Sequence, residues 1–146
     1  MKLIFLDIDG VLNSAHGKGP YISDMEIDKL ILLRHLIELS NSEGVVLTSD
    51  RRLSEVDMKN KLQAFEKYKI KVVGKLRRPN EEDDYDNRGK QIIDYLASSV
   101  DDIEKIVILD DNDDGISELF ENEFILLSRF DGLDDNSFID ALNKLK

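Results

Sequence analysis

The sequence predicts an α/β fold, a three-layer, Rossmann-like parallel sheet flanked by helices. Four short runs rich in isoleucine, valine and leucine alternate with stretches of helical period, which is typical of parallel strands joined by crossover helices. Each run is continuously apolar, as expected for a strand that is covered on both faces. A chain of 146 residues is long enough for one core, so we expect a single domain over residues 1–146.

The predicted elements follow one another along the chain. Strands are expected at residues 3–6, 45–47, 106–109 and 124–127, with a weaker one at 70–73. Ser23 and Glu26 have the spacing of a capping box and predict a helix that continues to Gly44. Ser54 is expected to open a second helix, and two more are expected at about residues 89–97 and at 138–145.

The composition excludes several classes of protein. With 41% hydrophobic residues, 35% charged residues and two prolines, the chain is predicted to be globular rather than disordered. The absence of cysteine excludes disulfides, thiolate catalysis and cysteine-bound zinc. No apolar run reaches the roughly 18 residues of a membrane span, and Asp7 and Asp9 interrupt the N-terminal run too early for a signal peptide. We therefore expect a cytoplasmic protein with no membrane partner.

The net charge of -11 argues against a general nucleic-acid coat, because such binding depends on lysine and arginine neutralising phosphates. Since the Debye length is about 8 Å at physiological salt, a local basic rim could still hold a polyanion. The candidates for such a rim are Arg51, Arg52, Lys75, Arg77 and Arg78. They either steer an anionic substrate toward the crevice or balance nearby acids as solvated surface charges.

Polar side chains follow three of the predicted strands. They are Asp7, Asp9 and Gly10 after the first strand, Thr48 and Ser49 after the second, and Asp110 and Asp111 after the third. Because ligands bind beyond the carboxyl ends of parallel strands, we expect these residues to converge. The period of two along a strand places Asp7 and Asp9 on one side, and Gly10 lets the chain turn away.

Several carboxylates in one crevice repel one another unless a cation neutralises them. Hard oxygen ligands without cysteine or histidine select Mg²⁺, so the combination predicts a magnesium site. Taken singly, an Asp-x-Asp-Gly sequence is equally typical of turns and helix caps. The alternative for the combination is a set of acidic strand ends that merely face water.

Residues 5–13, with the sequence FLDIDGVLN, resemble the first motif of the haloacid dehalogenase (HAD) superfamily. Segments that resemble the superfamily's later motifs follow in the same order. They are residues 45–48, a basic residue among 88–90, and residues 107–111. Within it, the combination of Thr48, Ser49 and Arg52 with the Arg-Gly sequence at Arg88 and the Asp110-Asp111 pair is most similar to the HAD domain associated with Swiss Army Knife RNA repair proteins.

The resemblance implies a role for each candidate residue. Asp7 would attack phosphorus and form an aspartyl-phosphate, while Asp9 would protonate the leaving oxygen and later activate water. An acid at the position of Asp9 is what phosphatases of the superfamily carry. Thr48 would bind a phosphoryl oxygen, and either Lys90 or Arg88 would neutralise the phosphoryl group; the spacing does not decide between them.

The resemblance also implies the ligands of the metal and of the substrate. Mg²⁺ would be held by the Asp7 carboxylate, the Asp9 backbone carbonyl, and Asp110 or Asp111, of which Asp111 is preferred. The residues expected to contact the substrate are Gly10, Asn13, Ser49, Arg51 and Arg52. Related polynucleotide 3'-phosphatases carry serine, glycine and arginine at the second motif, so the sequence after Thr48 departs from theirs.

Superfamily members that act on small metabolites generally carry an inserted cap domain, for which residues 14–44 and 50–87 leave little room. We therefore expect a minimal cap or none, and an open site. The predicted function is a Mg²⁺-dependent phosphatase for phosphate monoesters on nucleic-acid ends or nucleotides. The alternatives are a small-metabolite or phosphoprotein phosphatase and a non-catalytic module that binds metal or phosphate, against which the intact Asp7 and Asp9 argue.

Overall fold

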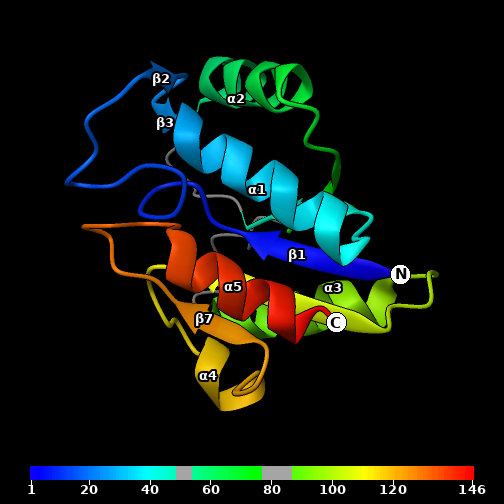
Figure 1. The fold of residues 1–146 in the computed structure, drawn as a ribbon. Coiled ribbons are helices and arrows are strands. Elements are labelled where there is room, and N and C mark those ends of the chain that lie inside the picture. The colour runs from blue at the N-terminus through cyan, green and yellow to red at the C-terminus, as the bar shows by residue number, and fades with distance from the viewer. Residues whose placement is uncertain (49–53, 77–86) are drawn as a thin grey trace.

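A computed structural model describes residues 1–48, 54–76 and 87–146. Its main sheet has five parallel strands in the order β5-β4-β1-β6-β7. The strands are β1 (Lys2–Leu6), β4 (Gly44–Leu47), β5 (Val72–Lys75), β6 (Lys105–Asp110) and β7 (Phe124–Leu126). The helices are α1 (Ile27–Ser40), α2 (Glu55–Lys67), α3 (Arg88–Ser98), α4 (Ile116–Leu119) and α5 (Asp135–Lys144). The predicted parallel α/β sheet is confirmed (Figure 1).

The two faces of the sheet have separate cores, which gives the predicted three layers. Successive strand side chains point to opposite faces, so Ile4 and Leu6 of β1 pack with residues of α1, α2 and α5. Leu3 and Phe5 of the same strand pack with residues of α3 and α4. Within α1, Leu30, Leu33 and Leu36 recur at helical spacing and are fully buried against the sheet, which explains why this segment is a helix.

Most helix starts agree with the sequence, but the start of α1 does not. Ser54 caps α2 as predicted, because its side chain accepts a hydrogen bond from the backbone of Asp57. Ser23 was expected to cap α1, and this prediction is wrong. Ser23 and Asp24 both have left-handed backbone, with φ of 48° and 62°, and form the tight turn between β2 (Tyr21–Ile22) and β3 (Met25–Glu26). Two such residues in succession make a hairpin turn, so α1 begins only at Ile27.

Other boundaries differ by a few residues. The first helix ends at Ser40 instead of reaching Gly44, since Asn41 adopts a left-handed conformation that closes α1. Gly44 is the first residue of β4. The predicted last helix begins earlier, at Asp135, where Asp134 and Ser137 form a capping box.

The register of the sheet brings the functional strand ends into one row. Leu6 of β1 pairs with Leu47 of β4 and with Leu109 of β6. The pairing continues one step further, because the Thr48 N–H donates to the Leu6 carbonyl and the Asp7 N–H donates to the Leu109 carbonyl. Asp7, Thr48 and Asp110 therefore lie at the same level of the carboxyl edge, as the sequence predicted.

Little structure is inserted around this edge. In the described part of the chain, residues 7–26 between β1 and α1 contain only loops and the two-stranded β2-β3 sheet, and α2 packs on the main core. The expectation of a minimal cap agrees with this arrangement (Figure 1). Within residues 1–48, 54–76 and 87–146, the search for a helix able to cross a membrane found none.

The core on the α1 face predicts a contrast between two leucines of one helix. Leu33→Ala should lower the free energy of unfolding by about 2 to 5 kcal/mol, because it removes a fully buried side chain. Leu39→Ala is the matched control, since Leu39 is 63% exposed, and should change it by less than about 0.5 kcal/mol. Urea titration of both variants measures the difference, and equal losses would contradict this description of α1.

Candidate active site

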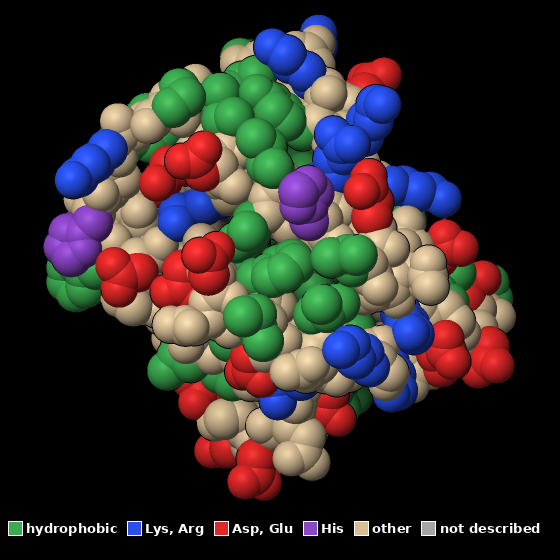
Figure 2. All heavy atoms as spheres, in the orientation of Figure 1, with side chains coloured by type: hydrophobic (Ala, Val, Ile, Leu, Met, Phe, Trp, Pro, Cys, Tyr) green, Lys and Arg blue, Asp and Glu red, His purple; other side chains and the backbone are tan. Residues whose placement is uncertain are grey.

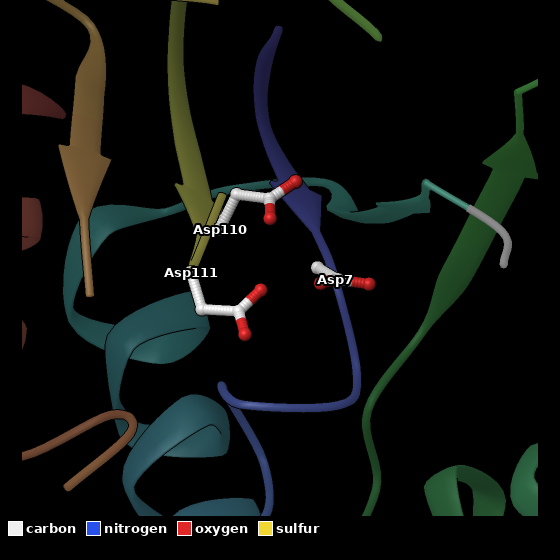
Figure 3. A group of neighbouring side chains, drawn as sticks. All are labelled: Asp7, Asp110 and Asp111. Carbon is white, nitrogen blue, oxygen red and sulfur yellow. The ribbon is translucent and has the colours of Figure 1, made fainter. Parts of the chain in front are cut away.

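Three carboxylates converge at the carboxyl edge of the sheet (Figure 3). One oxygen from each of Asp7, Asp110 and Asp111 lies within 4.8 Å of the others. Asp7 and Asp110 are buried, with 8% and 0% exposure, and Asp111 is half-buried. A close set of oxygen donors with no sulfur or nitrogen ligand fits Mg²⁺ better than a transition metal.

Arg88, the first residue of α3, reaches into this cluster. One guanidinium nitrogen, Nη1, lies 2.6 Å from Asp110 Oδ2 and 3.7 Å from Asp7 Oδ2. The other oxygen of Asp110, Oδ1, accepts a hydrogen bond from the backbone N–H of Asn112. Both oxygens of Asp110 thus already accept hydrogen bonds from the protein, whereas no donor within residues 1–48, 54–76 and 87–146 bonds to the Asp111 carboxylate.

The charges of the cluster are not balanced by Arg88 alone. Burial, together with the nearby Asp110 and Asp111, raises the pKa of Asp7 to about 9 against the opposing effect of Arg88. Burial also raises the pKa of Asp110, again opposed by Arg88. For Arg88, burial would lower the pKa, but Asp110 and Asp7 outweigh it and the pKa is raised. A cluster that favours a bound proton is one that a divalent cation would stabilise.

Gly10 is required by the close approach of the chain to the cluster. Its φ is +78°, and a Cβ atom there would collide with the carboxylate of Asp111. Its N–H donates to the side-chain oxygen of Asn13 at 2.9 Å. The structure therefore gives Gly10 a conformational role, and its predicted contact with substrate stays a prediction.

Asp9 lies apart from the three clustered carboxylates. It is exposed, and its Oδ1 accepts a hydrogen bond from Asn13 Nδ2 at 2.9 Å. The same Nδ2 donates to the Asp24 carbonyl, which ties Asp9 to the β2-β3 hairpin. The strand period used to place Asp9 beside Asp7 does not apply here. β1 ends at Leu6, and the Ile8 carbonyl begins a tight turn.

Thr48 lies in the same row as Asp7, at the end of β4. It is only 2% exposed, and its hydroxyl oxygen has no hydrogen-bond partner within the described parts of the chain. Buried polar atoms are almost always hydrogen-bonded, because an unpaired one costs free energy. The orphaned hydroxyl therefore fits a site that receives an oxygen-rich ligand.

Two of the remaining predicted residues, Lys90 and Lys75, are exposed, and the others lie outside the described residues. Lys90 is exposed, and its backbone N–H donates to the side chain of Asn87, the N-cap of α3. Lys75 is exposed on β5. The predicted contacts at Ser49, Arg51, Arg52, Arg77 and Arg78 lie outside the described residues.

The sequence did not predict one feature next to the site. Asp114 accepts two hydrogen bonds that hold α3 against the loop after β6, and we call this pair of bonds the Asp114 clasp. The Asp114 carboxylate accepts the Arg88 N–H at 3.1 Å, and the Asp114 carbonyl accepts the Gly89 N–H. A Cβ atom on Gly89 would collide with the Gly115 carbonyl. At the helix that begins at Ile116, Asp113 instead of Asp114 accepts the bonds from Ser117. Gly89 and Gly115 are the residues in the sequence that could have indicated this close approach of the two segments.

The strand order, the converging carboxylates and the basic residue at the start of α3 define a HAD domain. A family model described as "HAD domain in Swiss Army Knife RNA repair proteins" matches residues 3–138, and the chain belongs to this family. No curated protein matches the chain. The family predicted from the motifs is confirmed.

The raised pKa of Asp7 predicts how the metal-free protein responds to pH. A carboxyl with a pKa near 3.8 when unfolded and about 9 when folded binds more protons in the native state, so stability falls as pH rises between these values. Asp7→Asn removes that penalty and should be more stable than the wild type at pH 7 to 8, with a difference that grows by at most about 1.4 kcal/mol per pH unit. Urea titration in EDTA from pH 5 to pH 9 measures it.

Asp113→Asn is the control of opposite sign. Hydrogen bonds from Ser117 hold the pKa of Asp113 below its usual value, so its carboxylate stabilises the native state at neutral pH and this variant should be slightly less stable. A wild type that is no less stable than Asp7→Asn at pH 8 would contradict the burial of an unbalanced charge at Asp7.

Proposed function

We propose that the protein is a Mg²⁺-dependent phosphatase that hydrolyses phosphate monoesters, with nucleic-acid ends or nucleotides as substrates. The observation that supports this most is the row of side chains at the carboxyl edge of the sheet. Asp7 lies there near the carboxylates of Asp110 and Asp111, the guanidinium of Arg88 and the hydroxyl of Thr48, which has no hydrogen-bond partner among the described residues. Nucleophile, countercharge and hydrogen-bond donor are thus held on rigid strand ends and a helix start.

The metal would be held mainly by Asp7 and Asp111. Asp110 is the weaker candidate of the pair, because its two oxygens already accept hydrogen bonds from Arg88 and Asn112. The backbone carbonyl of Asp9 is the third ligand that the HAD resemblance implies. When bound, Mg²⁺ would neutralise the clustered carboxylates and polarise a phosphoryl oxygen.

In the proposed reaction, an oxygen of Asp7 attacks phosphorus and the bond from phosphorus to the ester oxygen breaks. Asp9 gives its proton to the leaving oxygen, which departs as an alcohol. In the second step Asp9 takes a proton from water, and the water oxygen attacks the aspartyl-phosphate. This releases inorganic phosphate and restores Asp7. Asn13 holds the Asp9 carboxylate in place, and Thr48 donates to a phosphoryl oxygen.

Of the two basic candidates, Arg88 is favoured as the residue that neutralises the phosphoryl group. Its guanidinium already contacts Asp7 and Asp110, and the Asp114 clasp fixes the first turn of α3 beneath it. A planar guanidinium can offer two parallel donors to phosphate oxygens while keeping its bond to a carboxylate.

The substrate class follows from the family and from the open edge. The matching family is described by its occurrence in RNA repair proteins, which favours a phosphorylated nucleic-acid end. Only short loops and the β2-β3 hairpin border the edge among the described residues. A bulky phosphate ester could therefore reach Asp7 without displacing an inserted domain.

The first test compares the wild type with Asp7→Asn. With Mg²⁺, the wild type should hydrolyse p-nitrophenyl phosphate and oligonucleotides with a terminal phosphate, and Asp7→Asn should lose at least about 1,000-fold in kcat. EDTA should abolish turnover, and Mg²⁺ should restore it. Phosphate release measures all of these rates.

Equal hydrolysis by Asp7→Asn would remove the nucleophile from the mechanism. Activity on nucleotides without any on oligonucleotides would remove the nucleic-acid end as substrate. A wild type that raises its Tm with Mg²⁺ yet hydrolyses none of these esters would favour the non-catalytic module instead.

The second test separates Arg88 from Lys90. Arg88→Lys should lower kcat/KM for p-nitrophenyl phosphate by about 10- to 100-fold, because an ammonium group cannot reproduce the planar set of donors. Lys90→Arg, the reciprocal exchange two residues away on α3, should cost less than about 3-fold. Circular dichroism of both variants checks that α3 is intact, and a larger loss for Lys90→Arg would reverse the assignment.

A further inference from the structure

Two loops lie side by side at the carboxyl edge of the sheet, at the end where β1 and β7 point (Figure 1). Residues 14–20 follow the first strand, and residues 128–133 follow β7. The Ala15 N–H donates to the Arg129 carbonyl and the His16 N–H donates to the Phe130 carbonyl, both at 3.0 Å. These two hydrogen bonds join the two segments.

An exposed aromatic stack sits on this junction. The rings of His16 and Phe130 are stacked, with centroids 5.5 Å apart and planes 30° from parallel, and the Arg129 guanidinium lies 5.4 Å from the centre of the Phe130 ring. Phe130 is 47% exposed and the His16 side chain is 71% exposed. We call these three residues the aromatic platform. Both aromatic side chains thus keep a large part of their surface exposed.

The platform is held in place by buried groups beneath it. Lys29 is buried, and its ammonium donates to the carbonyls of Asp131 and Leu133. Gly132, with φ of +61°, lets the chain turn, and its N–H donates to the Ser128 carbonyl. A surface that is ordered before binding loses little conformational entropy when a ligand arrives.

The platform is close to the carboxylate cluster. The Leu127 N–H donates to the Asp110 carbonyl, and the Leu133 N–H donates to the Val11 carbonyl, so the loop is attached at both ends to segments that carry the site. Phe130 is three residues from Leu127, a span of at most about 11 Å. A nucleotide whose phosphate reaches Asp7 could place its base on such a neighbour.

We propose that the aromatic platform of His16, Arg129 and Phe130 binds a base of the substrate whose phosphate is removed at Asp7. This inference rests on the proposed phosphatase function and names its substrate class as a nucleotide or the terminal nucleotide of a nucleic acid. Unpaired bases stack on aromatic rings and on arginine in proteins that bind single strands, and arginine over a ring adds cation–π attraction.

The charges around the platform limit it to one or a few bases. His16 Nδ1 lies 3.4 Å from Asp131 Oδ1, and several acidic side chains lie among apolar and basic ones at the left end of the molecule (Figure 2). A long phosphate backbone would be repelled there, since nucleic-acid affinity depends on neutralising phosphates. Stacking of a terminal base avoids that repulsion.

The kinetic test compares two oligonucleotides that differ only in whether the phosphorylated terminal nucleotide carries its base. In the wild type the ratio of kcat/KM with the base to kcat/KM without it should exceed 1. Phe130→Leu, which keeps the apolar volume and removes the π face, should lower this ratio by about 5- to 100-fold, the range expected for one stacked base. Phe130→Trp should keep it. Leu119→Ala on α4, which replaces an equally exposed apolar side chain, is the control and should leave it unchanged.

A binding test decides the matter independently of turnover. The chain has no tryptophan, so Phe130→Trp introduces a single fluorophore, which AMP should quench by stacking and ribose 5-phosphate should not. Quenching in a protein without phosphatase activity would support the platform while the proposed function fails. Absence of quenching, or an active enzyme whose ratio is unchanged in Phe130→Leu, would overturn the platform.

Discussion

The ion pair between Arg88 and Asp110 is the contact on which the rest of the site depends. Asp110 has no exposed surface, and a buried carboxylate without a partner carries a heavy desolvation cost. Arg88 offsets that cost at 2.6 Å and also lies near Asp7, so a cation from α3 joins the ends of β1 and β6. The pair leaves the cluster short of positive charge, which is the condition that would favour a divalent cation.

The parallel register gives this contact its place. Because β4, β1 and β6 pair residue by residue, the next positions along them, Thr48, Asp7 and Asp110, share one level of the edge. Apolar residues cover both faces of these strands, so burial fixes the strands while the last side chains face the crevice. The candidate site residues thus lie directly at the carboxyl edge of a rigid sheet.

In the described part of the chain, loops and the β2-β3 hairpin border the edge. Asn13 links Asp9 to the β2-β3 hairpin, and Lys29 secures the loop that carries Phe130. Asn13 donates to the Asp9 side chain and to one backbone carbonyl, and Lys29 donates to two backbone carbonyls. The conformation of both bordering segments is therefore fixed by a few local hydrogen bonds. These two borders support the proposal of a large ester whose base stacks at Phe130.

The sequence by itself determined the sheet, the acidic strand ends and the family, because apolar runs and motif spacing are local properties of the chain. It could not choose between Arg88 and Lys90, since both open the same helix. Only the packing of α3 on the loop held by Asp114 directs Arg88 to Asp110. The start of α1 and the separation of Asp9 from Asp7 were also decided in three dimensions. The pairing of β2 with β3 sets the backbone at Ser23, and the turn after Leu6 ends the strand period on which the placement of Asp9 relied.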